Sequence, residues 1–171
     1  MKLGQAIKTA LEFEIGVHKV YLDAMQQTTD EAAKRVFEVL SAEETGHIGY
    51  LRSRLDEWQK TGHITLQKLE TSIPKKAAID KGLNKLRKTV KPKPTVQTAE
   101  LQVLKRALEV EIQTSNFYEE MVRTLNGDGK RLFERFVEIE KGHQAIVQAE
   151  IDSVTGLGFW FDTEEFRLEE A

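Results

Sequence analysis

The sequence contains no cysteine among its 171 residues. Without thiols the chain cannot form disulfide bonds, bind zinc through thiolates, build a cysteine-ligated iron–sulfur cluster or use a cysteine nucleophile. It also lacks a hydrophobic run long enough to cross a membrane. Near the N-terminus, Glu12 and Glu14 interrupt any apolar segment that would serve as a signal peptide. We therefore expect a cytoplasmic protein that does not enter the membrane.

An excess of positive charge is absent as well. The formal net charge is -3 at pH 7 and the sequence pI is about 5.9, which argues against a general nucleic-acid-binding protein. A chain of this length suits one domain with a sizeable core. We therefore treat residues 1–171 as a single domain.

What the sequence does contain is a repeated Glu-x-x-His motif, at Glu44–His47 and Glu140–His143. Residues three apart on a helix differ by about 300° of rotation and about 4.5 Å of rise, so both side chains can face one point. Hydrophobic residues accompany the two copies at equal offsets: Phe37, Leu40, Leu51, Leu55 and Trp58 in the first, and Phe133, Phe136, Val147, Ile151 and Val154 in the second. The motif therefore lies on the core-facing side of each predicted helix.

A second repeated pattern precedes each motif. Ala-Leu-Glu-x-Glu occurs at 10–14 and at 107–111, and in each copy a tyrosine follows the last glutamate by seven residues. The repeat offset is 97 residues for this pattern and 96 for the Glu-x-x-His motif. The chain is therefore an internal duplication of a helix pair.

Periodicity and turn residues predict an all-α fold built from two antiparallel helix pairs, residues 3–61 and 98–155. In the first pair, the turn at Thr28-Thr29-Asp30 supplies N-cap residues for the second helix, and Gly62 ends that helix.

The second pair turns at Asn126-Gly127, and Asp128 or Gly129 opens its second helix. Because both turns are short, each pair forms a helical hairpin.

Residues 62–97 join the two pairs as a crossover along the length of the bundle. After Pro74, hydrophobic residues recur at helical spacing and predict a short amphipathic helix; they are Ile79, Leu83, Leu86 and Val90. The segment is also rich in basic residues, namely Lys75, Lys76, Lys81, Lys85, Arg87, Lys88, Lys91 and Lys93. This basic face is either a solvated surface or a dock for an acidic electron donor or a polyanion.

The tail, residues 156–171, contains the adjacent aromatics Phe159, Trp160 and Phe161. These side chains favour packing across a bundle end or a dimer interface, or lining the access to a site. Asp162 and Glu165 have the spacing of a capping box for a last helical turn.

If the four apolar stripes face inward, six ionisable residues converge: Glu14, Glu44, His47, Glu111, Glu140 and His143. Four ionised carboxylates in an apolar core are strongly destabilising unless they are neutralised. Two divalent metal ions neutralise them, and six ligands leave coordination positions open. Mixed oxygen and imidazole ligation favours iron or manganese, and zinc also fits. The alternative is a set of internal salt bridges without metal.

These motifs resemble the rubrerythrin branch of the ferritin-like superfamily, over the four bundle helices but neither the crossover nor the tail. The resemblance implies a ferritin-like four-helix bundle with a non-haem di-iron site that reacts with hydrogen peroxide or dioxygen. We expect peroxide reduction; a dioxygen-reactive oxidase or ferroxidase, or a non-catalytic iron-handling or storage protein, is the alternative. Ferritin-like bundles commonly form dimers, so a homodimer is expected.

Two features depart from rubrerythrins. Rubrerythrins carry a rubredoxin-like domain with four cysteines for electron delivery, so in this chain the electrons have to come from another protein. Rubrerythrins also place an extra glutamate three residues after the third-helix ligand, where this sequence has Thr114. The missing carboxylate weakens the expectation of rubrerythrin-style peroxide chemistry.

Three further residues have more than one interpretation. His18, four residues after Glu14, is either a partly buried helix residue or an additional ligand or proton carrier. Tyr21 and Tyr118 are either core tyrosines or residues that orient a carboxylate ligand by a hydrogen bond. A tyrosine can also act as a one-electron relay.

Overall fold

The structure is a computed structural model that describes residues 1–29, 31–89 and 98–156. These residues form five helices and no strand, so the predicted all-α class is confirmed for the described part of the chain. The helices are α1 (Leu3–Gln27), α2 (Glu31–Thr61), α3 (Lys76–Thr89), α4 (Thr98–Thr124) and α5 (Gly127–Val154).

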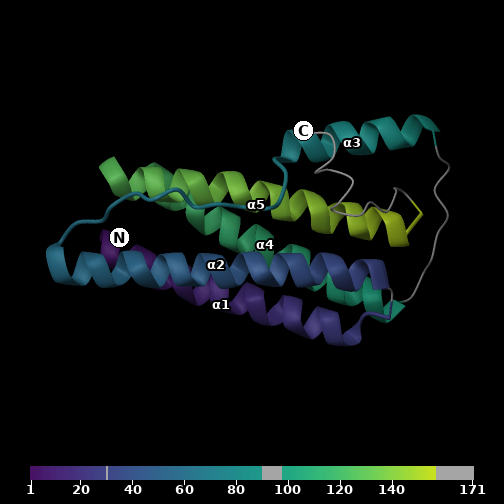
Figure 1. Ribbon diagram of the computed structural model, residues 1–171, viewed down its shortest axis with the longest axis horizontal. Helices are drawn as coiled ribbons and strands as arrows, with labels where there is room; N and C mark the ends of the chain where they lie inside the picture. Colours follow the sequence, from purple (N-terminus) through teal and green to yellow (C-terminus); the bar gives the residue numbers. More distant parts are fainter. Residues whose placement is uncertain (30, 90–97, 157–171) are drawn as a thin grey trace.

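The four long helices lie side by side, and the shorter α3 lies along one end of α5 (Figure 1). α1 packs against both α2 and α4, and α4 packs against α5. This arrangement is compatible with a helical bundle. No helix in the described ranges combines the length and the apolar character needed to cross a membrane.

Helix ends agree with the sequence-based predictions to within one or two residues. α2 ends at Thr61, and the next residue, Gly62, has a φ of 75°, the left-handed conformation that terminates helices at glycine. α5 begins at Gly127, earlier than the predicted Asp128 or Gly129, because Asn126 already has the extended backbone of an N-cap residue. Asp30, which we expected in the first turn, lies outside the described residues.

A layer of ionisable side chains divides the hydrophobic core into two clusters. One cluster includes Val17, Leu40 and Ile146, and the other includes Ala10, Leu51 and Phe136. Along every long helix, the predicted ligands fall between the members of these two clusters. The apolar residues therefore enclose the polar layer from both ends of the molecule.

The first part of the crossover, residues 62–75, is fastened to the two helices that carry the Glu-x-x-His motifs. On the α2 side, Tyr50 donates a hydrogen bond to the carbonyl oxygen of Gln67 at 2.9 Å. On the α5 side, Arg135 donates to the carbonyl oxygen of Leu69 through Nε and Nη2, at 3.1 and 2.8 Å. We call residues 62–75 the strap.

The amphipathic helix predicted after Pro74 is α3. Its residue Ile79 is fully buried in the core, and Leu83 and Leu86 are partly buried against the same cluster. The described basic residues of this segment are exposed, among them Lys81 and Arg87. The predictions for Val90, Lys91, Lys93 and the tail residues Phe159, Trp160, Phe161, Asp162 and Glu165 fall outside the described residues.

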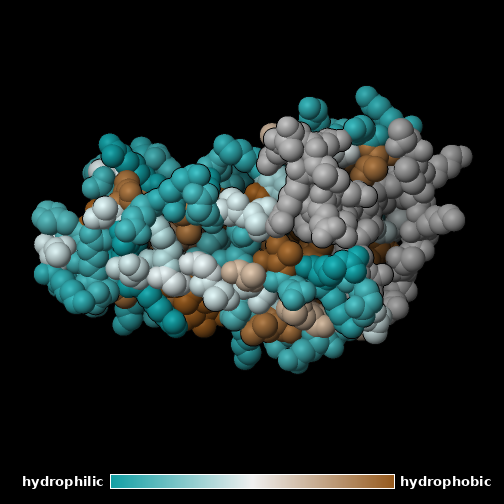
Figure 2. All heavy atoms as spheres, viewed as in Figure 1, coloured by the Kyte–Doolittle hydropathy of each residue, from teal (hydrophilic) through white to brown (hydrophobic). Residues whose placement is uncertain are grey.

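The face of the molecule seen in Figure 2 is mainly hydrophilic, and hydrophobic side chains appear on it in separate groups. Large exposed hydrophobic residues of the long helices include Ile15 and Leu22 on α1 and Ile112 on α4.

Candidate metal centre

The six predicted ligands all lie in the polar layer between the two core clusters. Each is at most 1% exposed to solvent: Glu14 on α1, Glu44 and His47 on α2, Glu111 on α4, and Glu140 and His143 on α5. Burial of this extent is unusual for carboxylates and requires compensation by charge or hydrogen bonding.

The six side chains form two overlapping groups, each compact enough to hold a metal ion. One group consists of Glu14, Glu44, His47 and Glu140, and the other consists of Glu44, Glu111 and His143. In each group, one ligand atom from every residue lies within 4.8 Å of the others. The described residues therefore contain buried Glu and His groups that can bind metal.

Glu44 belongs to both groups because its two oxygens face different histidines. Its Oε2 lies 3.3 Å from His47 Nδ1, and its Oε1 lies 3.0 Å from His143 Nδ1. The two imidazole rings are nearly parallel, with centroids 5.4 Å apart. A carboxylate in this position can bridge two ions.

Both histidines direct Nδ1 toward carboxylates. His47 Nδ1 lies 3.2 Å from Glu14 Oε2, and His143 Nδ1 lies 3.6 Å from Glu111 Oε1 in addition to its contact with Glu44. Nδ1 is therefore the nitrogen that each ring offers to a metal ion.

Most polar atoms of this layer have no hydrogen-bond partner within the described part of the chain. They include both oxygens of Glu44 and of Glu140, Glu111 Oε2, and Nε2 of both histidines. Buried polar groups are nearly always paired, and an unpaired buried carboxylate is strongly destabilising. The donor set therefore fits divalent metal ions, which compensate several such atoms at once.

The pKa shifts of these residues also reflect buried carboxylates that no positive charge fully neutralises. Burial, followed by the nearby Glu44 carboxylate, raises the pKa of Glu14 to about 8. Burial and the charge of Glu111 raise the pKa of Glu140 well above its usual 4.5. Burial opposes the charged form of His47, but the carboxylates of Glu44 and Glu14 outweigh it and raise its pKa to about 10. Without metal, protons take the place of positive charge in this layer.

The two tyrosines hold carboxylates of the opposite helix pair. The hydroxyl of Tyr21 on α1 donates to Oε1 of Glu111 on α4, and the hydroxyl of Tyr118 on α4 donates to Oε1 of Glu14 on α1. Both tyrosines are fully buried. Each hydroxyl therefore contacts a predicted ligand, as expected of a tyrosine that orients a carboxylate.

His18 is not part of either group. It is half-buried on α1, and its Nε2 lies 3.3 Å from the hydroxyl of Thr45 on α2. The structure thus places it as a partly buried helix residue.

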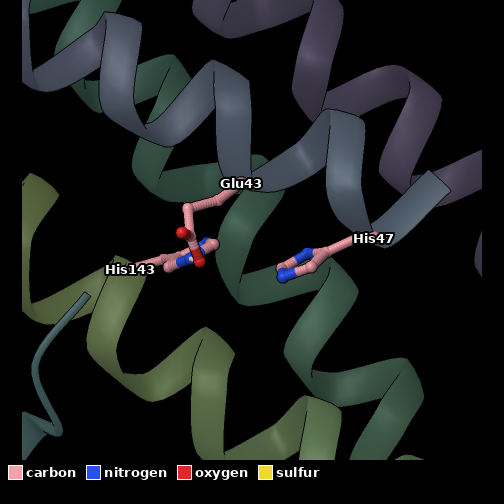
Figure 3. A group of neighbouring side chains, drawn as sticks. All are labelled: Glu43, His47 and His143. Atoms are coloured by element: carbon pink, nitrogen blue, oxygen red, sulfur yellow. Dashed lines mark ion pairs between the residues drawn. The ribbon is translucent and has the colours of Figure 1, made fainter. Parts of the chain in front are cut away.

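Sequence reasoning missed one residue of the site, Glu43. Its carboxylate accepts hydrogen bonds from Thr71 Oγ1 at 2.5 Å, Ser72 N at 2.8 Å and Ser72 Oγ at 2.7 Å. Figure 3 shows this carboxylate pointing toward the ring of His143, and Glu43 Oε2 lies 4.0 Å from His143 Nε2.

The carboxylate of Glu43 is kept ionised by its partners. Burial opposes ionisation, but the nearby imidazole of His143 and the hydrogen bonds from Thr71 and Ser72 lower its pKa to about 2. The sequence signal for Glu43 was weak, because a glutamate beside the motif ordinarily occupies a solvated helix face.

Comparison with known proteins finds no family model, no curated protein and no solved structure that matches this chain.

Proposed function

We propose that this chain is a rubrerythrin-like di-iron protein of the ferritin-like superfamily, with duplicated helix pairs, and that it reduces hydrogen peroxide. The observation that carries the proposal is the pair of buried Glu and His groups that share Glu44. Four carboxylates and two imidazoles provide the charge and the donor types suited to two ferrous ions.

Iron bound at this centre would supply the two electrons that cleave the peroxide O–O bond. The balanced reaction consumes one hydrogen peroxide, two electrons and two protons and releases two water molecules. The chain has no cysteine to hold a second redox centre of the rubredoxin type. We propose that an external electron-donor protein returns the electrons.

The protein side chains contribute position and exclusion of water. Tyr21 and Tyr118 hold Glu111 and Glu14 by hydrogen bonds from opposite helix pairs, so both carboxylates are oriented before an ion arrives. The two apolar clusters close the layer at both ends. A buried and preorganised donor set of this kind supports reaction at the metal rather than loose surface binding.

A groove on the surface lies near the centre. A groove of about 560 Å³ runs along α1 and α4, and its lining includes Val17 and Thr114. Each of these residues lies one helical turn past a predicted ligand, Glu14 or Glu111. We propose that hydrogen peroxide approaches the centre from this groove.

Thr114 supports the second candidate function, a dioxygen-reactive oxidase or ferroxidase. Its hydroxyl donates to the carbonyl oxygen of Val110 at 2.9 Å and is turned to its own helix. Thr114 therefore does not replace the extra carboxylate that rubrerythrins carry at this position. An iron-handling role is the remaining alternative.

Anaerobic loading with ferrous iron tests these candidates. We expect two irons per chain, and rapid appearance of the near-ultraviolet absorption of oxidised iron after stoichiometric peroxide, with a slow change under dioxygen. Faster oxidation by dioxygen would support the oxidase or ferroxidase. Two tightly held irons that respond to neither oxidant would leave an iron-handling role.

The proposal extends to the partners of the protein. We propose a homodimer that works in the cytoplasm, with the exposed basic residues of α3 as the dock for an acidic electron donor. Strong salt dependence of electron transfer, and its loss when Lys81 and Arg87 are replaced by glutamate, would support this dock. Unchanged rates in that variant would leave these residues as a solvated face.

A further inference from the structure

The two repeated halves of the centre differ beside Nε2 of their histidines, the ring nitrogen that faces away from Glu44. Glu43, four residues before His47, faces His143 from across the bundle. With the repeat offset of 96, the equivalent position in α5 is Ile139, a buried hydrophobic residue. Only one copy of the helix pair therefore places a carboxylate at this position.

The geometry of His143 gives that carboxylate a chemical role. Because Nδ1 faces Glu44 and Glu111, it is the nitrogen available to a metal ion. A neutral imidazole that binds metal through Nδ1 carries its hydrogen on Nε2. Glu43 Oε2 lies 4.0 Å from that Nε2, so a shift of about 1 Å creates a hydrogen bond of ordinary length.

His47 has a different environment. Its ring meets the ring of Phe136 edge-on, with centroids 5.4 Å apart and an interplanar angle of 75°. Its Nε2, like that of His143, has no hydrogen-bond partner among the residues that the structure describes. Glu43 lies within 4.8 Å of both histidines, but its ion pair in the described part of the chain is with His143, at 4.0 Å.

Glu43 itself is held rigidly by the strap. Ser72 donates to Oε1 through both its backbone N–H and its hydroxyl, and Thr71 donates to Oε2. These bonds fix the side chain at the junction of α2, α5 and the strap. A carboxylate held in place by three donors can impose its orientation on the histidine beside it.

We propose that Glu43 is a positioning residue that makes the two metal positions unequal, by holding the Nε2 hydrogen of His143 and strengthening the position formed by Glu44, Glu111 and His143. This inference rests on the metal-binding part of the proposed function and is independent of the oxidant. A carboxylate behind a metal-bound histidine typically changes metal affinity by about 10–100-fold.

Anaerobic titration of the full chain with Co²⁺ tests the inference, read out by calorimetry and by the visible absorption of the bound ion. We expect two unequal binding steps in the wild type. Glu43→Gln keeps the shape and accepting oxygen of the side chain but removes its charge, and it weakens the step at the His143 position by about 10–100-fold. The step at the His47 position should be unchanged.

Single-site backgrounds assign the effect to one position. Glu14→Gln removes a ligand that only the His47 position uses, and Glu111→Gln removes one that only the His143 position uses. Adding Glu43→Gln should weaken the remaining site in the Glu14→Gln protein and have no effect in the Glu111→Gln protein. Equal effects in both backgrounds would overturn the proposal.

A control variant separates the carboxylate from the strap. The double substitution Thr71→Val and Ser72→Ala removes hydroxyl donors to Glu43 but retains its charge, so we expect a smaller loss of affinity than with Glu43→Gln. A loss as large as that of Glu43→Gln would overturn the proposal by assigning the effect to strap docking. Nitrogen NMR of the Zn²⁺-loaded protein should show the His143 hydrogen on Nε2.

Other results identify which proposal fails. If the wild type binds no Co²⁺, Zn²⁺ or Fe²⁺, both the proposed function and this inference fail. If two ions bind and Glu43→Gln leaves both affinities unchanged, only this inference fails. A third bound ion that Glu43→Gln abolishes would also overturn it, because Glu43, His47 and His143 would then form a separate metal site.

Discussion

Tyr118 of α4 donates the hydrogen of its hydroxyl to Oε1 of Glu14 on α1, across 104 residues of sequence. Tyr21 of α1 makes the equivalent bond to Glu111 on α4. Each tyrosine therefore orients a carboxylate of the opposite helix pair, and each of these carboxylates belongs to a different metal-binding group. Two reciprocal hydrogen bonds therefore connect α1 and α4 at the centre.

The first prediction concerns these tyrosines. Tyr118→Phe leaves Glu14 without its donor and should weaken metal binding at the position that contains His47, by about 10-fold or more. Tyr21→Phe should do the same at the position that contains His143. Stepwise Co²⁺ titration measures both effects.

Tyr50→Phe is the matched control for the tyrosine variants. The hydroxyl of Tyr50 donates a hydrogen bond to the carbonyl oxygen of Gln67 in the strap, and not to a predicted ligand. We expect a much smaller loss of metal affinity in this variant than in the two tyrosine variants, because its bond is to the strap and not to a predicted ligand. Equal losses in all three variants would show that general destabilisation, and not ligand orientation, produces the effect.

The second prediction separates shared from unshared ligands. Glu44 belongs to both metal-binding groups, whereas Glu111 belongs to one of them. Glu44→Gln should therefore weaken both metal-binding steps, and Glu111→Gln should weaken one and leave about one ion bound per chain. Metal analysis after anaerobic dialysis measures the stoichiometry. Retention of two ions by Glu44→Gln would rule out a bridging role.

Helical periodicity explains why so much of the centre could be predicted from the sequence. Leu40 and Leu51 define the core-facing stripe of α2, and residues between them on the same face, such as Glu44 and His47, have to be buried with it. Both are at most 1% exposed. The repeat in the sequence then doubled the number of observations, because the Glu-x-x-His motif and its flanking hydrophobic positions recur in α5.

Contacts with the strap could not be predicted in this way. Residues 62–75 have no periodic pattern that fixes their path, so the sequence did not reveal that Thr71 and Ser72 meet Glu43. Nor did periodicity indicate which glutamate each tyrosine would bond, because that depends on the packing of α1 against α4. Helix faces follow from local spacing, whereas contacts between segments require the path of the whole chain.

The third prediction concerns pH and the metal-free protein. The pKa of Glu14 is raised to about 8 and that of His47 to about 10 in the folded state. A raised folded-state pKa means that the folded state binds the proton more tightly than the unfolded chain. Protonation of Glu14 therefore stabilises the folded state fully below about pH 4.5, and this stabilisation is lost as the pH rises through 8. Protonation of His47 stabilises it fully below about pH 6.5, and this stabilisation is lost as the pH rises through 10.

Thermal unfolding of the metal-free protein at about pH 5, 7 and 9 measures this effect. We expect the melting temperature to fall as the pH rises over this range, and to fall less in the metal-loaded protein, because metal ions replace the protons. Glu14→Gln should reduce the slope of the metal-free protein between pH 5 and 8. A melting temperature that rises from pH 5 to pH 9 without metal would contradict the assignment.

The last prediction uses two glycines at equivalent positions of the Glu-x-x-His motifs. A Cβ added at Gly142 of α5 would lie 2.9 Å from the carbonyl oxygen of Pro74 and 3.3 Å from Ile73 Cγ2, both in the strap. A Cβ added at Gly46 of α2 would meet no atom within 4 Å. The backbone oxygen of Pro74 cannot rotate away, so Gly142→Ala forces the strap to move.

Opposite stability changes should follow. Gly142→Ala should destabilise the protein by about 1–3 kcal/mol, the usual range for overpacking, whereas Gly46→Ala should stabilise it by about 0.4–1 kcal/mol because alanine favours the helix. Urea unfolding of the metal-free variants measures both. Similar changes in the two variants would mean that the strap does not pass this close to α5.

Because Pro74 lies two residues after Ser72, displacement of the strap should also loosen its bonds to Glu43. Gly142→Ala should then weaken metal binding at the His143 position more than at the His47 position.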